Sequence, residues 1–289
     1  MTQTPTPKKP LLIALLATAV LATAGLSYYF SSSQEAGTAP EKMPVDTTKK
    51  SVVKPDVAMA LNDLFGVSSP GGSIKTAPDA LTGLWFEQSF SMDNRQYHVV
   101  FTKTQTVDPE KNAPFDSHVQ GVIVGAATYV LKDEAWQLVG KQKEIGEIGS
   151  WGDAPEVKNA AILTLSPSQI AFMIDFGYGM GGFFEEGKVL FGFSNDTWQD
   201  LGFIQTGSNN SGSCDDTEQE AEPDSPLMGP CWGYTGTITA LPETHNNFPD
   251  LSIVKQGTEI TEEQKLPVPA KNSTYIFDGQ KYADATGED

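Results

Sequence analysis

Residues 170–178 read Ile-Ala-Phe-Met-Ile-Asp-Phe-Gly-Tyr, with a large apolar side chain at every second position. Alternate side chains of a strand point to opposite faces, so this spacing predicts a strand with one strongly apolar face and a lighter one behind it. A second apolar run occupies 189–193 and ends at a Ser-Asn-Asp turn signal, and a third covers 201–204. We therefore predict a three-stranded antiparallel meander over about 161–206, and we place the centre of the core there.

Four eight-residue segments share a pattern that is typical of tight hairpins. Each begins with an aromatic residue, has a large apolar residue two positions later and ends with an aromatic residue; they are 90–97, 129–136, 191–198 and 275–282. The second apolar residue should face the final aromatic residue across the strands, which contributes roughly 0.2–1 kcal/mol per pair. The predicted partners are Met92 with Tyr97, Leu131 with Trp136, Phe193 with Trp198 and Phe277 with Tyr282. The irregular spacing of the segments argues against a strict repeat protein.

These patterns predict an all-β domain at 56–289, made of antiparallel sheets built from aromatic-paired hairpins in a sandwich- or barrel-like arrangement. A short amphipathic helix is expected near 56–67, where apolar residues recur at helical spacing and a Ser-Pro-Gly-Gly stretch follows. Polar connections are expected at 106–118, 143–156, 242–250 and 257–271.

The N-terminal region predicts a membrane anchor. Lys8 and Lys9 are the only charges in residues 1–10, and residues 11–30 are uncharged over about 20 positions, enough for one transmembrane helix. The positive-inside rule places residues 1–10 in the cytoplasm of a bacterium and the residues after 30 in the periplasm, with residues 11–30 in the inner membrane. A cleavable signal peptide is the alternative, because 22–24 reads Ala-Thr-Ala. Residues 31–55 are rich in Ser, Thr, Pro and Lys and predict a disordered spacer.

Charge narrows the classes of partner. The chain has 19 Lys and Arg against 37 Asp and Glu, for a formal net charge of −18. Such an excess of acids argues against binding to nucleic acid and against adsorption to anionic lipid. It agrees with simple solubility or with a basic protein partner.

The two cysteines, Cys214 and Cys231, predict a disulfide, because an oxidising compartment favours pairing and neither has a metal ligand at a suitable spacing. Residues 215–224 between them hold six acids. The weak calcium candidates there are Asp215, Asp216, Glu218 and Glu220. The spacing of a preformed calcium hand is absent, so a solvated loop or a contact to a basic protein is the competing interpretation.

No motif assigns catalysis, a cofactor or a nucleotide. The glycine-rich stretch 177–182 lacks the lysine and the following helix that a phosphate-binding loop requires. His98, His118 and His245 are scattered, and no Gly-x-Ser-x-Gly elbow is present. His98, in an expected strand, has a structural role as its default interpretation.

The sequence therefore favours a membrane-anchored, acidic, extracytoplasmic β-domain of a bacterial envelope that acts as a non-catalytic binding module. One alternative is an inhibitor or immunity-type protein that masks a basic envelope toxin or hydrolase. A second alternative is an envelope enzyme whose catalytic residues come together from distant loops.

Overall fold

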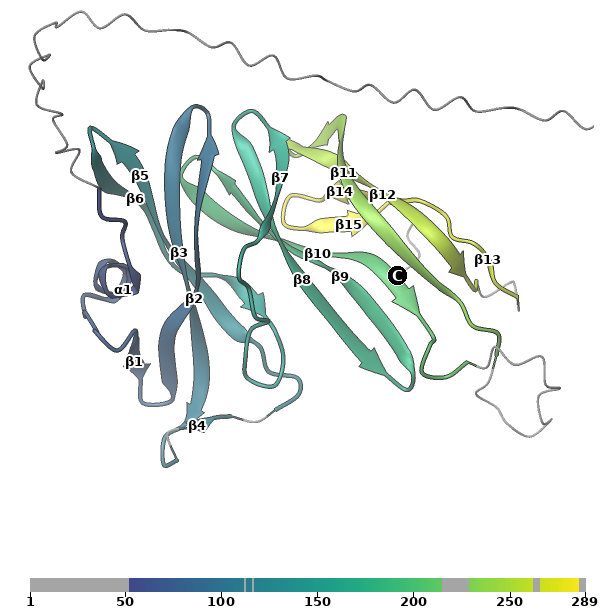
Figure 1. Cartoon of the computed structure of the whole chain (residues 1–289), viewed down its shortest axis with the longest axis horizontal. Helices are drawn as coiled ribbons and strands as arrows, with labels where there is room; N and C mark the ends of the chain where they lie inside the picture. Colours follow the sequence, from purple (N-terminus) through teal and green to yellow (C-terminus); the bar gives the residue numbers. More distant parts are fainter. Residues whose placement is uncertain (1–51, 112, 116, 215–228, 262–265, 286–289) are drawn as a thin grey trace, which may run out of the picture. The chain divides into compact units, whose positions relative to one another are not determined.

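The computed structural model describes residues 52–111, 113–115, 117–214, 229–261 and 266–285 (Figure 1). The chain is mostly antiparallel β, as predicted. The strands of the first sheet pair in the order β1-β2-β3-β5-β6, and β4 lies beside β3. Their bounds are β1 (Ser73–Ala77), β2 (Ala80–Met92), β3 (Arg95–Asp108), β4 (Ala113–Pro114), β5 (Val122–Lys132) and β6 (Ala135–Ile148).

The second sheet follows the chain order from one edge to the other, except that β13 lies beside β12. Its strands are β7 (Ala161–Ser166), β8 (Gln169–Met180), β9 (Phe183–Ser194), β10 (Thr197–Asn209), β11 (Gly233–His245), β12 (Phe248–Glu259), β13 (Val268–Pro269), β14 (Ser273–Phe277) and β15 (Tyr282–Asp284). The predicted meander is confirmed, since β8, β9 and β10 are consecutive antiparallel neighbours.

Two-residue turns with left-handed backbone angles set the register of the hairpins. Positive φ at both central residues occurs at Asp93-Asn94, Asp133-Glu134, Asn195-Asp196 and Asn246-Asn247, as primed hairpin turns require. The predicted pairs Leu131–Trp136, Phe193–Trp198 and Phe277–Tyr282 are confirmed. The first pair is wrong: Tyr97 faces Phe90, because the Asp93-Asn94 turn lies one residue earlier than expected.

The strands β8–β10 are buried on both faces, which explains why their intervening positions are also apolar. One face packs against the first sheet through Phe172, Ile174, Phe191, Phe193 and Trp198. The other face packs against β11, β12, β14 and β15 through Ala171, Leu190, Leu201 and Ile204. Each fully buried large side chain contributes about 1.5–3 kcal/mol, so the meander is the centre of the core, as predicted.

The predicted helix is confirmed as α1 (Val57–Phe65). It begins at Asp56, whose carboxylate accepts a hydrogen bond from the Met59 N–H at 2.9 Å, and it ends at Gly66 in the left-handed region. Ala60 and Leu64 pack on Val100, Ala127 and Tyr129 of the first sheet. The helix therefore covers the face of that sheet opposite the main core.

Two glutamine side chains form hydrogen bonds with backbone groups that have no neighbouring strand to pair with. Gln142 of β6 donates to the Trp198 carbonyl and accepts from the Trp198 N–H, both at 2.8 Å. Gln88 of β2 bonds Ala160 in the same two-way manner, at 3.0 and 2.7 Å. These amides satisfy backbone groups that no strand reaches, and they join the two sheets.

Within the described parts of the chain, no helix has the length and apolarity needed to span a membrane. The transmembrane segment predicted at 11–30, the cytoplasmic end at 1–10 and most of the spacer at 31–55 lie outside the described residues.

Candidate functional site

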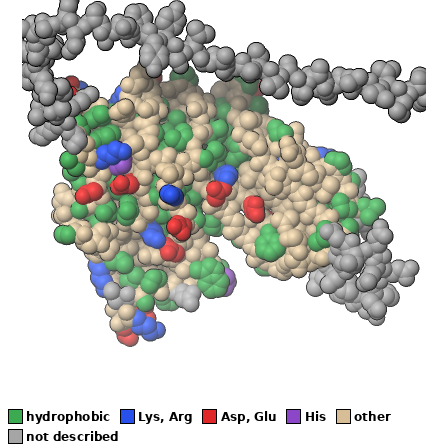
Figure 2. Space-filling view, in the orientation of Figure 1, with side chains coloured by type: hydrophobic (Ala, Val, Ile, Leu, Met, Phe, Trp, Pro, Cys, Tyr) green, Lys and Arg blue, Asp and Glu red, His purple; other side chains and the backbone are tan. Residues whose placement is uncertain are grey.

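The most distinctive surface is an apolar tip where β8 and β9 project past the core. We define the apolar tip as Tyr178, Met180, Phe183 and Phe184, whose exposed fractions are 55%, 83%, 46% and 41%. The first three continue the strand face that is buried at Phe172 and Ile174, but the first sheet no longer covers it. In Figure 2 this end of the domain shows separate apolar side chains among other surface atoms. Met180 and Phe183 are paired across the strands, and neighbouring exposed apolar side chains of this kind typically mark an interaction site.

The end of the tip is held by glycine geometry. Gly181 and Gly182 form the turn, both with positive φ. The Gly212 N–H donates to the Gly182 carbonyl at 3.0 Å, and a Cβ on Gly182 would lie only 2.6 Å from the Gly212 carbonyl carbon. Position 182 therefore requires glycine for both its backbone angle and its close contact.

The predicted disulfide is confirmed and lies beside the tip. Cys214 and Cys231 are bonded, with their Cα atoms 4.9 Å apart. Asn210, which is buried, donates to the Pro230 carbonyl and accepts from the Trp232 N–H, so it fixes the second cysteine arm to β10. The Trp232 ring in turn lies 6.4 Å from the Phe183 ring, centroid to centroid.

Acidic groups border the tip. Tyr178 donates its hydroxyl to Glu185, and this hydrogen bond, followed by burial, raises the Tyr178 pKa. Glu186 is the next residue on β9, and Asp175 forms an ion pair with Lys188 nearby on the same hairpin. The surface therefore combines apolar side chains with carboxylates.

A groove of about 360 Å³ adjoins the tip through Phe176. Phe176, Val189 and Phe203 of the second sheet line it, together with Ile148 of β6 and Val119 of the connection that precedes β5. The two acids that line the groove already have partners within the fold. Asp200 pairs with Lys281 at 2.9 Å and accepts from the Gly202 N–H, and Glu147 accepts from the Gly121 N–H. The lining of the groove is therefore partly apolar and partly polar.

The weak calcium candidates Asp215, Asp216, Glu218 and Glu220 lie outside the described residues. Among the residues that are described, no three His, Cys, Asp or Glu side chains are grouped to hold a metal ion.

The three histidines are not brought together. His98 is buried between Ser89 and the Pro55 carbonyl, His118 lies beside Trp151, and His245 pairs with Asp250 at 2.7 Å. The arrangement around His98 was missed by sequence reasoning, because its partners depend on the register of the β2–β3 hairpin.

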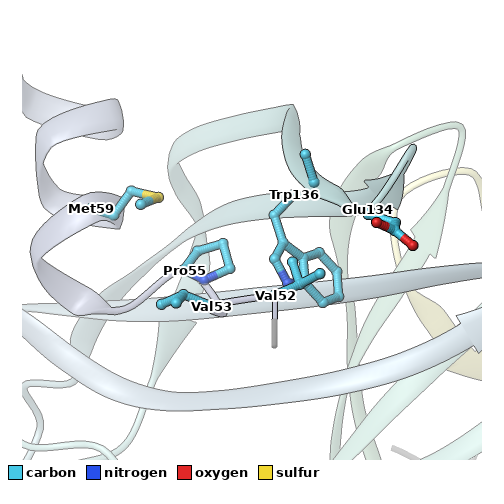
Figure 3. Close-up of a pocket in the computed structure, with 7 residues that line it drawn as sticks. Val52, Val53, Pro55, Met59, Glu134 and Trp136 are labelled. Atoms are coloured by element: carbon cyan, nitrogen blue, oxygen red, sulfur yellow. The ribbon is translucent and has the colours of Figure 1, made fainter. Parts of the chain in front are cut away.

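A pocket of about 310 Å³ lies close to His98, between the N-terminal segment and the β5–β6 turn. Figure 3 shows the Trp136 indole beside Val52, with Pro55, Met59 and Glu134 around the pocket. Trp136 is half-buried, and its indole N–H has no acceptor among the described residues.

The chain matches no protein-family model, and no match was found among the curated proteins or the solved structures compared with it.

Proposed function

We propose that the domain is a non-catalytic binding module and that the apolar tip is its contact surface. The observation that carries this proposal is the exposure of Tyr178, Met180 and Phe183 on a strand face that is core elsewhere. Burying such side chains against a partner would favour binding by about 25 cal/mol per Å² of apolar surface that is removed from water. Aromatic side chains of this kind are also the usual anchors of protein interfaces.

We further propose that the partner is a basic protein. Glu185 and Glu186 border the tip, and the sequence between the bonded cysteines beside it holds six acids within 215–224. Negative charge around an apolar centre steers a cationic partner and sets its orientation. An inhibitor or immunity-type role, in which the domain masks a basic envelope toxin or hydrolase, is the sharper form of this proposal.

The proposal includes a location. Residues 11–30 form a retained single-pass anchor in the inner membrane, and the β-domain faces the periplasm. N-terminal sequencing of the membrane-bound protein tests this: a mature chain that begins at Gly25 would show that the segment is a cleaved signal peptide.

Site-specific photo-crosslinking in cells tests the tip. A benzophenone amino acid replaces Phe183 in the full chain, and the control replaces Leu138, which is 39% exposed on β6. We expect a crosslinked adduct of discrete mass at position 183, weaker at high salt, and none at position 138. Equal adducts at the two positions would remove the tip as the contact surface.

Two neighbouring glycines give a matched pair of variants for the same experiment. Gly181→Ala and Gly182→Ala both place alanine at positive φ, which costs about 1–2 kcal/mol. A Cβ at 181 meets open space, whereas one at 182 collides with Gly212 and Ser213. Adduct formation from position 183 should survive Gly181→Ala and fall with Gly182→Ala, since only the second change displaces the tip from the Gly212–Ser213 segment that follows β10.

A further inference from the structure

A second group of side chains, far from the tip in sequence, has the geometry of an activated serine. Ser89 of β2 and His98 of β3 are cross-strand partners on the face of the first sheet that α1 covers. Ser89 is exposed, whereas His98 is only 2% exposed. The serine oxygen and His98 Nδ1 are 3.0 Å apart.

The hydrogen bonds on both sides of His98 fix where its proton lies. His98 Nε2 is 3.1 Å from the Pro55 carbonyl oxygen, which can only accept. Nε2 therefore carries the hydrogen, and Nδ1 presents a lone pair. The Ser89 hydroxyl consequently donates to Nδ1. The Pro55 carbonyl orients the ring in the way that a third group orients the base in a nucleophile–base pair.

Burial of His98 favours the same state. Burial is the largest effect and lowers the His98 pKa from its ordinary value; Lys54 adds to the decrease, whereas Glu87 and the hydrogen bond to the Pro55 carbonyl act in the opposite direction. The imidazole is thus neutral near pH 7 and free to accept a proton. Lys54 Nζ donates to Ser89 Oγ at 3.0 Å, and a positive charge at that distance stabilises a developing alkoxide.

Ser89 also has space for a small reactant. It lines a pocket of about 280 Å³ together with Lys54, Tyr97 and Trp136. Trp136 is shared with the neighbouring pocket of Figure 3, and its indole N–H is a buried donor without an acceptor in the described part of the chain. Such an orphan donor is costly for the fold alone.

We propose that Ser89 is a nucleophile activated by His98 and that it accepts acyl groups from small esters. Ser89 Oγ forms a bond to the ester carbonyl carbon while its proton moves to His98 Nδ1. The bond from that carbon to the alkoxy oxygen then breaks, and His98 returns the proton to the leaving alcohol. Water attacks the acyl-serine with His98 again as base, which releases the carboxylic acid and restores the Ser89 hydroxyl.

In this scheme Ser89 and His98 are the reacting groups, and Lys54 favours esters that carry a negative charge. The scheme is independent of the apolar tip, which uses other strands and other side chains. Failure of the tip as a contact surface and failure of the serine chemistry are therefore distinguishable, but ester hydrolysis at Ser89 would replace the non-catalytic part of the proposed function.

Labelling of the full-length protein with a fluorophosphonate probe tests the proposal. Peptide mass spectrometry should place the adduct on Ser89, and Ser89→Ala should abolish it. Ser168→Ala is the control, because Ser168 is exposed in the turn between β7 and β8 of the other sheet and does not line this pocket. This variant should be labelled at the wild-type rate. An adduct that is absent from Ser89, or no faster there than at Ser168, overturns the proposal.

The base is tested by His98→Gln. General-base catalysis contributes about 10²–10⁴-fold, so the labelling rate should fall by at least about 10²-fold. Wild-type labelling by a variant that remains folded would overturn the role of His98. If the variant does not fold, the wild-type pH profile decides. The rate must rise with loss of one proton at a midpoint below pH 6.5, followed down to the lowest pH at which the protein stays folded; a midpoint at or above pH 6.5, or no pH dependence over that whole range, overturns the role of His98. Glu87 and Lys54 are the charged groups that act on the ring, which also contacts Ser89, the Pro55 carbonyl and Trp136.

Discussion

Replacing Trp198 with alanine tests the central claim about the fold, which is that β10 joins the two sheets through one aromatic side chain. Trp198 is 2% exposed. Its ring centroid lies 4.8–5.8 Å from four phenylalanine rings, two in each sheet: Phe90, Phe101, Phe172 and Phe193. Its indole N–H donates to Thr128 Oγ1 at 2.9 Å.

The magnitude follows from these contacts. Removing a buried tryptophan costs about 3–5 kcal/mol through lost burial and the cavity that remains. Thr128 is buried and loses the indole as a partner, which adds about 1 kcal/mol. The free energy of unfolding should therefore fall by roughly 4–6 kcal/mol. With a urea slope of about 3 kcal/mol per M, the unfolding midpoint should fall by about 1.3–2 M.

Urea unfolding of the purified full-length protein, followed by circular dichroism, measures this shift. Trp151→Ala is the control, because it removes the same side chain at a site that is 62% exposed and already at positive φ. It should change stability by no more than about 0.5 kcal/mol. A Trp198→Ala midpoint within about 0.2 M of the wild type, which is the largest shift expected of the control at that slope, would refute the packing described here.

Three further predictions follow from single features. Gln142→Ala should lower the free energy of unfolding by about 1–3 kcal/mol because it leaves the Trp198 N–H and carbonyl without partners. Gln137 is exposed on the same strand, so Gln137→Ala should leave the midpoint unchanged in the same urea assay. The Cys214–Cys231 disulfide joins residues that are 17 positions apart, and reducing it should lower the free energy of unfolding by roughly 3 kcal/mol. Hydrogen exchange should then become faster mainly at 207–239. Faster exchange throughout β8 and β9 would contradict this prediction. Burial is the largest cause that raises the pKa of Tyr97 and of Tyr234 to about 12. The neutral form of each tyrosine therefore contributes stability that is complete below pH 10 and is lost between pH 10 and 12. The fall of the urea midpoint at alkaline pH should be smaller in Tyr97→Phe than in the wild type.

The hairpins show which features of the fold can be predicted from a short stretch of sequence. Asn195-Asp196 follows a strongly alternating run, so sequence alone placed both the turn and the Phe193–Trp198 pair. The Asn246-Asn247 turn was missed, and 242–250 was expected to be a polar connection, because Pro242 and Pro249 interrupt the pattern. The register shifts between Ala240 and Thr244, and Pro242 lies at that irregularity, where the missing N–H costs little.

The candidate sites depend on longer-range geometry, and sequence predicted them poorly. The alternation at 170–178 indicates an apolar face but not where the opposite sheet stops covering it, so the exposure of Tyr178 could not be inferred. Whether Ser89 faces His98 depends on the register of the β2–β3 hairpin. The aromatic pattern predicts a turn one residue further along the chain, and that turn would pair Ser89 with another residue. The observed Asp93-Asn94 turn places Ser89 opposite His98.

The apolar tip differs from an ordinary exposed loop because a regular ladder supports it. The pairing of β8 with β9 runs without a shift from Ile170–Phe193 in the core to Met180–Phe183 at the end, and β10 continues beside β9 as far as Phe184. The same backbone therefore anchors Phe172 in the core and presents Met180 to solvent. Backbone that is held this way loses little conformational freedom on binding, so the ordering cost at the tip falls on the side chains alone. The disulfide and the Asn210 contacts hold the neighbouring strand ends in the same manner, so Cys214 and Cys231 have fixed positions beside the ordered apolar surface.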